Sequence, residues 1–114
     1  MPSTRTPAPV SRSLARLGQD LSTWRKLLRL TAAEVADRAG ISENTVLRLE
    51  GGRGASLENV LRVARAVGVL EQIASSLDPF ATEVGQLRAE EALPKRVRSS
   101  RARLGAADMA GEGT

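Results

Sequence analysis

The sequence contains no cysteine and no histidine, and its only aromatic side chains are those of Trp24 and Phe80. Without cysteine, neither a disulfide framework nor a thiolate metal site can form. Without histidine, the chain lacks the commonest general base and the commonest metal ligand of proteins. The carboxylates form no paired constellation beyond helix-surface spacing. We therefore expect a protein that is not an enzyme, with no catalytic residue, no metal site and no cofactor.

Long apolar runs are also missing. No run approaches the roughly 20 residues that span a bilayer. The N-terminal stretch Met-Pro-Ser-Thr-Arg-Thr-Pro-Ala-Pro lacks the apolar segment of a signal peptide. These features predict an intracellular, cytoplasmic protein with no membrane partner, and a length of 114 residues predicts one domain with tails.

The net charge of +4 is unevenly distributed. Residues 17–78 carry eight basic and eight acidic side chains, whereas residues 1–16 carry a charge of +3 and residues 95–104 a charge of +5. Residues 79–94 and 105–114 each carry −2. Basic flanks beside a neutral globular part suit a polyanionic partner, because neutralising phosphates supplies much of non-specific affinity. The alternative is a solubilising tail.

Two short helical patterns meet at Gly40. The first opens with Thr31 as N-cap, and Glu34 three residues later completes a capping box. Gly40 can adopt the left-handed conformation that ends a helix, and Ser42 caps a second helix that runs to Glu50. A helix, a short turn containing glycine and a second helix form a helix-turn-helix arrangement. The inward-facing positions are Val35, Ala36, Ala39, Ile41, Val46 and Leu49.

The outward face of the second helix is polar. Its side chains can form hydrogen bonds with base edges, which makes them candidate DNA-contacting residues: Glu43, Asn44, Thr45 and Arg48. The alternative interpretation is an ordinary solvated helix face.

Three further helices are expected around this motif. Residues 1–12 hold three prolines and are predicted to be a disordered arm. A helical pattern begins at Ser13 and should be well formed nearer Gly18, because glycine weakens a helix. Trp24 is expected to anchor the core.

After a glycine-rich loop, Ser56 is expected to cap a helix that ends at Gly68, and a shorter helix covers about residues 69–77 before Asp78-Pro79. The expected inward face of the helix after Ser56 comprises Leu57, Val60, Leu61, Ala64 and Val67.

The C-terminal extension covers residues 79–114. Residues 80–93 carry a partial apolar stripe and can form one short helix, which either docks on the core, contacts another chain or frays. The basic tail that follows is predicted to be disordered. The expected organisation is therefore an arm at 1–12, a helical domain at 13–78 and the extension.

Residues 17–78 resemble the Xre/Cro–repressor type of helix-turn-helix domain, the five-helix fold of phage repressors. The resemblance implies an all-α, five-helix lambda-repressor-like DNA-binding domain with a basic, partly disordered C-terminal extension. It is carried by Leu17-Gly18-Gln19, Arg25-Lys26, Leu30-Thr31, Glu34-Val35-Ala36, Ala39-Gly40-Ile41-Ser42, Thr45-Val46, Leu49-Glu50 and Gly52-Arg53, with Leu57, Leu61 and Ala64 through Gly68 behind them.

In this family the helix from Ser42 lies in the major groove, which implies base contacts from Glu43, Asn44, Thr45 and Arg48. Because a carboxylate that faces DNA repels phosphate, Glu43 is expected either to accept a hydrogen bond from cytosine or to keep non-specific affinity low. The implied phosphate contacts are Arg25, Thr31, Ala32, Ser42 and Arg53.

The resemblance also pairs Arg25 with Glu50, either as a structural ion pair or as a surface pair of little worth. Ala32 stands where most relatives have glutamine, so one contact is expected to be missing. General attraction to DNA is then left to Arg25, Arg29, Arg53 and the basic flanks.

A narrower resemblance covers Gly54–Gly68, which matches a pattern frequent in antitoxins, here of the HipB type that partners a HipA-like serine/threonine kinase toxin. The resulting hypothesis is a homodimeric repressor that binds a palindromic operator in double-stranded DNA, in the bacterial cytoplasm with the nucleoid. As the antitoxin of a type II toxin–antitoxin pair, it would neutralise the kinase and autorepress its operon. The alternatives are a stand-alone Xre-type regulator and a protein-interaction module with little DNA binding.

Overall fold

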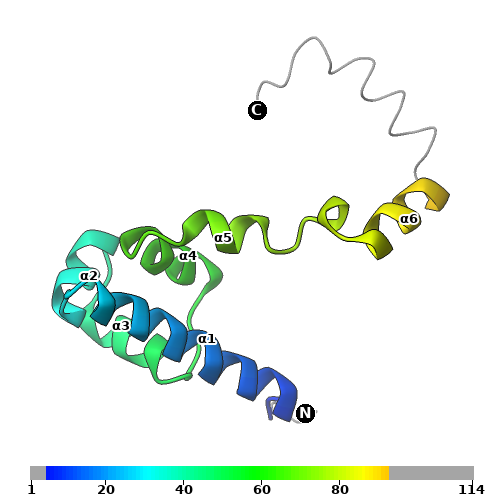
Figure 1. Ribbon diagram of the computed structural model, residues 1–114. Coiled ribbons are helices and arrows are strands. Elements are labelled where there is room, and N and C mark those ends of the chain that lie inside the picture. The colour runs from blue at the N-terminus through cyan, green and yellow to red at the C-terminus, as the bar shows by residue number, and fades with distance from the viewer. Residues whose placement is uncertain (1–4, 93–114) are drawn as a thin grey trace. The chain divides into compact units, whose positions relative to one another are not determined.

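The structure is a computed structural model that describes residues 5–92, and all of its regular elements are helical (Figure 1). They are α1 (Ala8–Leu27), α2 (Ala32–Ala39), α3 (Glu43–Glu50), α4 (Leu57–Ala66), α5 (Leu70–Ser75), the 3-10 helix η1 (Pro79–Ala81) and α6 (Glu83–Ala92). The all-helical class is confirmed. The chain divides into two units, Met1–Ser76 and Leu77–Thr114. Between residues 5 and 92, no helix combines the length and apolar character needed to cross a membrane.

Helix α1 begins at Ala8, earlier than the expected start at Ser13. Residues 8–12, which the proline content assigned to a disordered arm, are therefore helical. Pro7 occupies the N-cap position and Pro9 lies in the first turn. Proline is tolerated there because the N–H it lacks would have no partner within the helix, and its fixed φ already suits a helix.

The predicted helix caps are confirmed. The Thr31 hydroxyl accepts a hydrogen bond from the Glu34 N–H (3.0 Å), and the Thr31 N–H donates to the Glu34 carboxylate (2.8 Å). Ser42 and Ser56 each accept a hydrogen bond from the N–H three residues later, both at 3.1 Å. Because these bonds satisfy N–H groups that a helix leaves open, the serines and Thr31 determine where α2, α3 and α4 begin.

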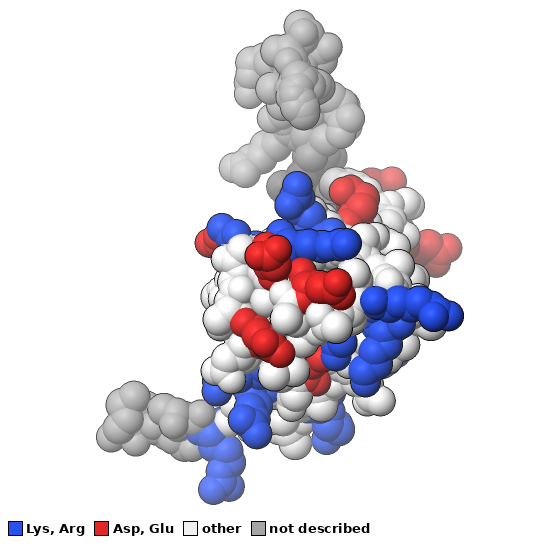
Figure 2. Space-filling model, turned by 90° about the vertical axis from the view of Figure 1, so that its left-hand side faces the viewer, with Lys and Arg blue, Asp and Glu red and all other residues white. Residues whose placement is uncertain are grey.

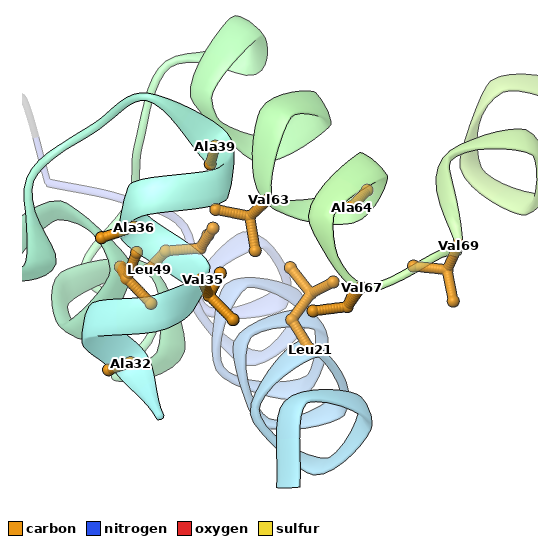
Figure 3. Packing of buried hydrophobic residues seen from close by; sticks show 11 residues of the cluster. Leu21, Ala32, Val35, Ala36, Ala39, Leu49, Val63, Ala64, Val67 and Val69 are labelled. Atoms are coloured by element: carbon orange, nitrogen blue, oxygen red, sulfur yellow. The ribbon is translucent and has the colours of Figure 1, made fainter. Parts of the chain in front are cut away.

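The core of the first unit lies where α1, α2, α3 and α4 meet (Figure 3). Its largest fully buried side chains are Val35, Val46 and Val63, contributed by α2, α3 and α4 respectively. Fully burying a valine contributes about 1.5–3 kcal/mol, so these residues hold the three helices together. The remaining members are Leu21, Ala32, Ala36, Ala39, Leu49, Ala64, Val67 and Val69.

The predictions that Trp24 and Leu57 lie in the core are wrong. Trp24 is 43% exposed and Leu57 is 71% exposed, and neither belongs to the core cluster. Alanines on α2 allow the helices to approach closely, so the core is filled by small aliphatic side chains. On α1 this space accommodates Leu21 rather than an indole ring.

The second unit consists of η1 and α6 within the described residues. The Asp78 carboxylate accepts a hydrogen bond from the Phe80 N–H (2.9 Å), and Gln86 donates to the Phe80 carbonyl (2.7 Å). Helix α6 lies inside the segment 80–93, where the apolar stripe predicts a helix. The end of that stripe, at Leu93, and the basic tail at 95–104 fall outside the described residues.

Candidate nucleic-acid interface

The turn between α2 and α3 is tight. Gly40 has φ 72°, and the N–H of Ile41 donates to the Ala36 carbonyl at 3.0 Å, which closes the end of α2. Such a left-handed residue is favourable for glycine because it has no Cβ. Ile41 is half-buried against the core, and Ser42 then starts α3. The turn therefore sets the direction in which α3 leaves α2.

Helix α3 presents a polar surface to solvent. Glu43, Asn44 and Arg48 are exposed, whereas Val46 is fully buried and Leu49 is 3% exposed. One side of the helix thus carries a carboxylate, an amide and a guanidinium group with nothing above them in the first unit. Together they offer hydrogen-bond donors and acceptors along about one and a half helical turns.

Thr45 lies at the edge of this surface. Its side chain is half-buried, and its hydroxyl lies 2.8 Å from the hydroxyl of Ser42. The Ser42 hydroxyl also accepts from the Thr45 N–H. Each hydroxyl has one hydrogen, and one of the two hydrogens is used in the bond between them. The pair therefore offers a single hydrogen-bond donor to an outside acceptor at the start of α3.

Arg25 and Glu50 form a part-buried, bidentate ion pair. The Arg25 Nε and Nη2 donate to the two Glu50 oxygens at 2.7 and 2.9 Å, and Nη1 donates to the Leu30 carbonyl at 3.0 Å. The two side chains are only 13% and 9% exposed. The hydrogen bond to Glu50 raises the pKa of Arg25 above its ordinary value. The pair therefore connects α1 to α3 through part-buried hydrogen bonds, and it is not the solvent-exposed kind of ion pair that contributes little to stability.

Gly18 lies where α1 packs against the end of α3. The local sequence pattern does not predict this packing role. A Cβ at this position would overlap the Leu49 carbonyl oxygen and lie 2.9 Å from the Glu50 carbonyl oxygen. Helix α1 and the end of α3 run alongside each other here, as Figure 1 shows. Glycine is thus used for close helix packing. Such an approach between residues 31 positions apart leaves no signal in the local pattern.

Arg62 makes a second long-range connection. Its Nη1 donates to the Ala39 carbonyl at the end of α2 (3.0 Å), and its Nε donates to Glu58 (3.0 Å). The spacing of Glu58 and Arg62 is visible in the sequence as an i,i+4 pair. The hydrogen bond to the Ala39 carbonyl is not visible in the sequence, and it connects the helix-turn-helix to α4.

Four of the expected phosphate-contacting residues lie at or next to the ends of α2 and α3, and the fifth, Arg25, lies on α1. The Ala32 side chain is 8% exposed and belongs to the core, so only its backbone N–H can face a ligand. The Thr31 hydroxyl accepts from Glu34 and keeps its own O–H as a donor. Arg53 is exposed in the loop directly after α3. Arg25 retains one N–H on each of Nη1 and Nη2 for an outside acceptor.

Charges of both signs share the surface. The face in Figure 2, seen from the left-hand side of Figure 1, carries acidic side chains among basic ones instead of a single basic patch. This agrees with the neutral charge balance of residues 17–78. Within residues 5–92, no cluster of three acidic side chains could hold a metal ion. The geometry favours recognition by hydrogen bonds over attraction by bulk charge.

A comparison with protein families agrees with this geometry. A family model described as a helix-turn-helix domain matches residues 16–74, a span that includes α2, α3 and α4. No curated protein and no solved structure matches the chain.

Proposed function

The chain belongs to the helix-turn-helix domain family, and from this we propose that it is a sequence-specific DNA-binding transcriptional repressor of the Xre/Cro type. The observation that carries the proposal is the exposed polar surface of α3, whose opposite side is buried and whose end is held to α1 by Arg25 and Glu50. In this binding mode α3 lies in the major groove. A helix held at both ends can present its side chains to base edges in one register.

Each base-contacting residue has a preferred partner. Arg48 suits guanine, Asn44 suits adenine, and Glu43 suits the cytosine amino group. Thr45 contributes a hydroxyl from the flank. The phosphate contacts assigned to this mode are the hydroxyls of Thr31 and Ser42, the backbone N–H of Ala32, and the guanidinium groups of Arg25 and Arg53.

We also propose a homodimer, because one α3 spans about one half-site, which is too little for genomic specificity. An apolar groove of about 470 Å³ between α1, α4 and α5 supports this proposal. The exposed Leu17, Trp24 and Leu57 line it, together with Asp20. A second copy that covers this groove would remove these side chains from water. Sedimentation that finds only monomer at high concentration would contradict the dimer.

The proposed function is tested by selecting duplexes from a randomised pool with the full-length chain. We expect a palindrome whose half-site centres lie about 34 Å apart or a multiple of that distance. Deleting residues 95–114 should reduce the salt dependence of binding if the tail contacts phosphates. If no sequence is enriched at physiological salt, the regulator hypothesis fails and a protein-interaction module is favoured.

A second candidate function is that of an antitoxin for a HipA-like kinase toxin, with repression of its own operon as part of the same role. Its support is the sequence of Gly54–Gly68, which forms the loop and α4 beside the apolar groove. The test is coexpression with the product of the neighbouring gene, followed by co-purification and a kinase assay. A neighbour that is not kinase-like, or one that does not bind, leaves the stand-alone regulator.

A further inference from the structure

Leu47 is an apolar residue on the polar surface of α3. Its side chain is 48% exposed, whereas the other aliphatic residues of the helix, Val46 and Leu49, are buried. Leu47 lies one turn after Glu43 and Asn44, so it projects between them on the outward face. It makes no contribution to the core cluster.

The position of Leu47 limits what it can bind in the major groove. A leucine side chain neither donates nor accepts a hydrogen bond, and the only apolar group that base pairs present there is the 5-methyl group of thymine. A single exposed leucine is common on protein surfaces. Leu47 differs from Leu57 or Leu77 because exposed hydrogen-bonding groups surround it on the side of α3 that the proposed mode turns toward bases.

We propose that Leu47 is a specificity-determining residue that selects thymine by contact with its 5-methyl group. The inference rests on the proposed DNA-binding function and adds a base preference to it. Residues one turn apart on a helix have Cβ atoms about 5–6 Å apart. Base pairs follow one another at about 3.4 Å. The selected thymine therefore lies within one or two base pairs of the base contacted by Asn44.

The test is a double-substitution cycle on the duplex selected by the full-length chain. Deoxyuridine replaces each thymidine in turn, which removes only the methyl group. Wild-type protein should lose about fourfold in affinity at one thymine of each half-site, the value of one buried methyl group. Leu47→Ala should bind the thymine duplex more weakly and show no further loss with deoxyuridine at that position. Leu28→Ala, which removes a leucine that is also 48% exposed and lies directly after α1, should retain the full deoxyuridine effect.

Three outcomes overturn the inference while leaving the proposed function in place. They are a selected site with no thymine near the adenine read by Asn44, a deoxyuridine loss that persists in Leu47→Ala, and a Leu47→Ala variant that binds the selected duplex as tightly as the wild type does. Failure of the wild-type chain to enrich any duplex overturns both proposals. Thermal unfolding of Leu47→Ala should match that of the wild type, because the side chain is not part of the core.

Discussion

Arg25 on α1 donates two hydrogen bonds, of 2.7 and 2.9 Å, to the carboxylate of Glu50 at the end of α3. The same guanidinium group bonds to the Leu30 carbonyl, just before α2 begins. One side chain therefore connects α1, the α1–α2 turn and α3. The turn at Gly40 fixes the start of α3, and the Arg25–Glu50 pair fixes its end. Both ends of the candidate recognition surface are therefore held by identifiable contacts.

Breaking this ion pair should destabilise the first unit. We expect Arg25→Ala or Glu50→Gln to lower the free energy of unfolding by about 2–4 kcal/mol. Arg25→Ala leaves the part-buried Glu50 carboxylate without its donors, and Glu50→Gln leaves the part-buried guanidinium group without a counter-charge and with one acceptor oxygen fewer. Urea denaturation measures the change. Glu58→Gln, which weakens the exposed Arg62–Glu58 pair, is the control and should cost less than about 1 kcal/mol. Equal losses of unfolding free energy for the two pairs would show that the Arg25–Glu50 pair stabilises the protein no more than an exposed ion pair does.

Replacing Gly18 should have the opposite sign to a normal glycine-to-alanine change in a helix. Alanine usually stabilises a helix interior by about 0.5–1 kcal/mol. Here its Cβ would overlap the Leu49 carbonyl, so we expect Gly18→Ala to destabilise by about 1–3 kcal/mol. Ser13→Ala, at an exposed position of the same helix, is the control and should be neutral or slightly stabilising. A stabilised Gly18→Ala protein would contradict the close approach of α1 and α3.

The capping box predicts a loss of stability in acid. The hydrogen bond from the Thr31 N–H lowers the pKa of Glu34 below its ordinary value. A lowered pKa means that the stabilising contribution is complete above the unfolded-state pKa and is lost as the pH falls through the folded-state value. The stability advantage of wild type over Glu34→Gln should therefore be constant above about pH 5 and shrink below about pH 4. An advantage that stays constant down to pH 3 would contradict the role of the ionised carboxylate.

Arg29 should separate stability from DNA affinity. It has φ 60°, a left-handed conformation that costs a non-glycine residue roughly 1 kcal/mol. Arg29→Gly should relieve this strain and raise the unfolding free energy by about 0.5–1 kcal/mol. The same change removes an exposed cation three residues before α2, so DNA binding should weaken and its salt slope should fall by about one. Arg29→Lys, which keeps both charge and strain, should match the wild type in both measurements.

Local patterns predict the helix-turn-helix well. Thr31, Glu34 and Ser42 cap their helices as expected because capping depends on residues three positions apart. Val46 and Leu49 are buried as expected because helical periodicity is also local. The geometry of the turn, the start of α3 and its outward face all follow from such short-range chemistry.

Contacts between distant residues could not be predicted in this way. The exposure of Trp24 depends on how closely α2 and α4 approach α1, and the burial of Gly18 depends on the carbonyl of Leu49. Arg62 bonds to Ala39 across 23 positions. The exposure of Leu47, in contrast, could have been predicted from the sequence, because a position one turn after Glu43 lies on the outward face of the helix.

The central claim is that α3 recognises DNA by sequence, and Arg48 tests it most directly. Binding of the selected duplex and of a scrambled duplex should be measured by fluorescence anisotropy at several salt concentrations. The matched control is Arg65→Ala, which removes the same charge from an exposed position on α4. We expect Arg48→Ala to lose about 1–3 kcal/mol of binding free energy on the selected duplex and to lose discrimination at one base pair per half-site, with Arg65→Ala close to wild type. Equal losses for the two variants on both duplexes would mean that binding is only electrostatic, and would contradict recognition through α3.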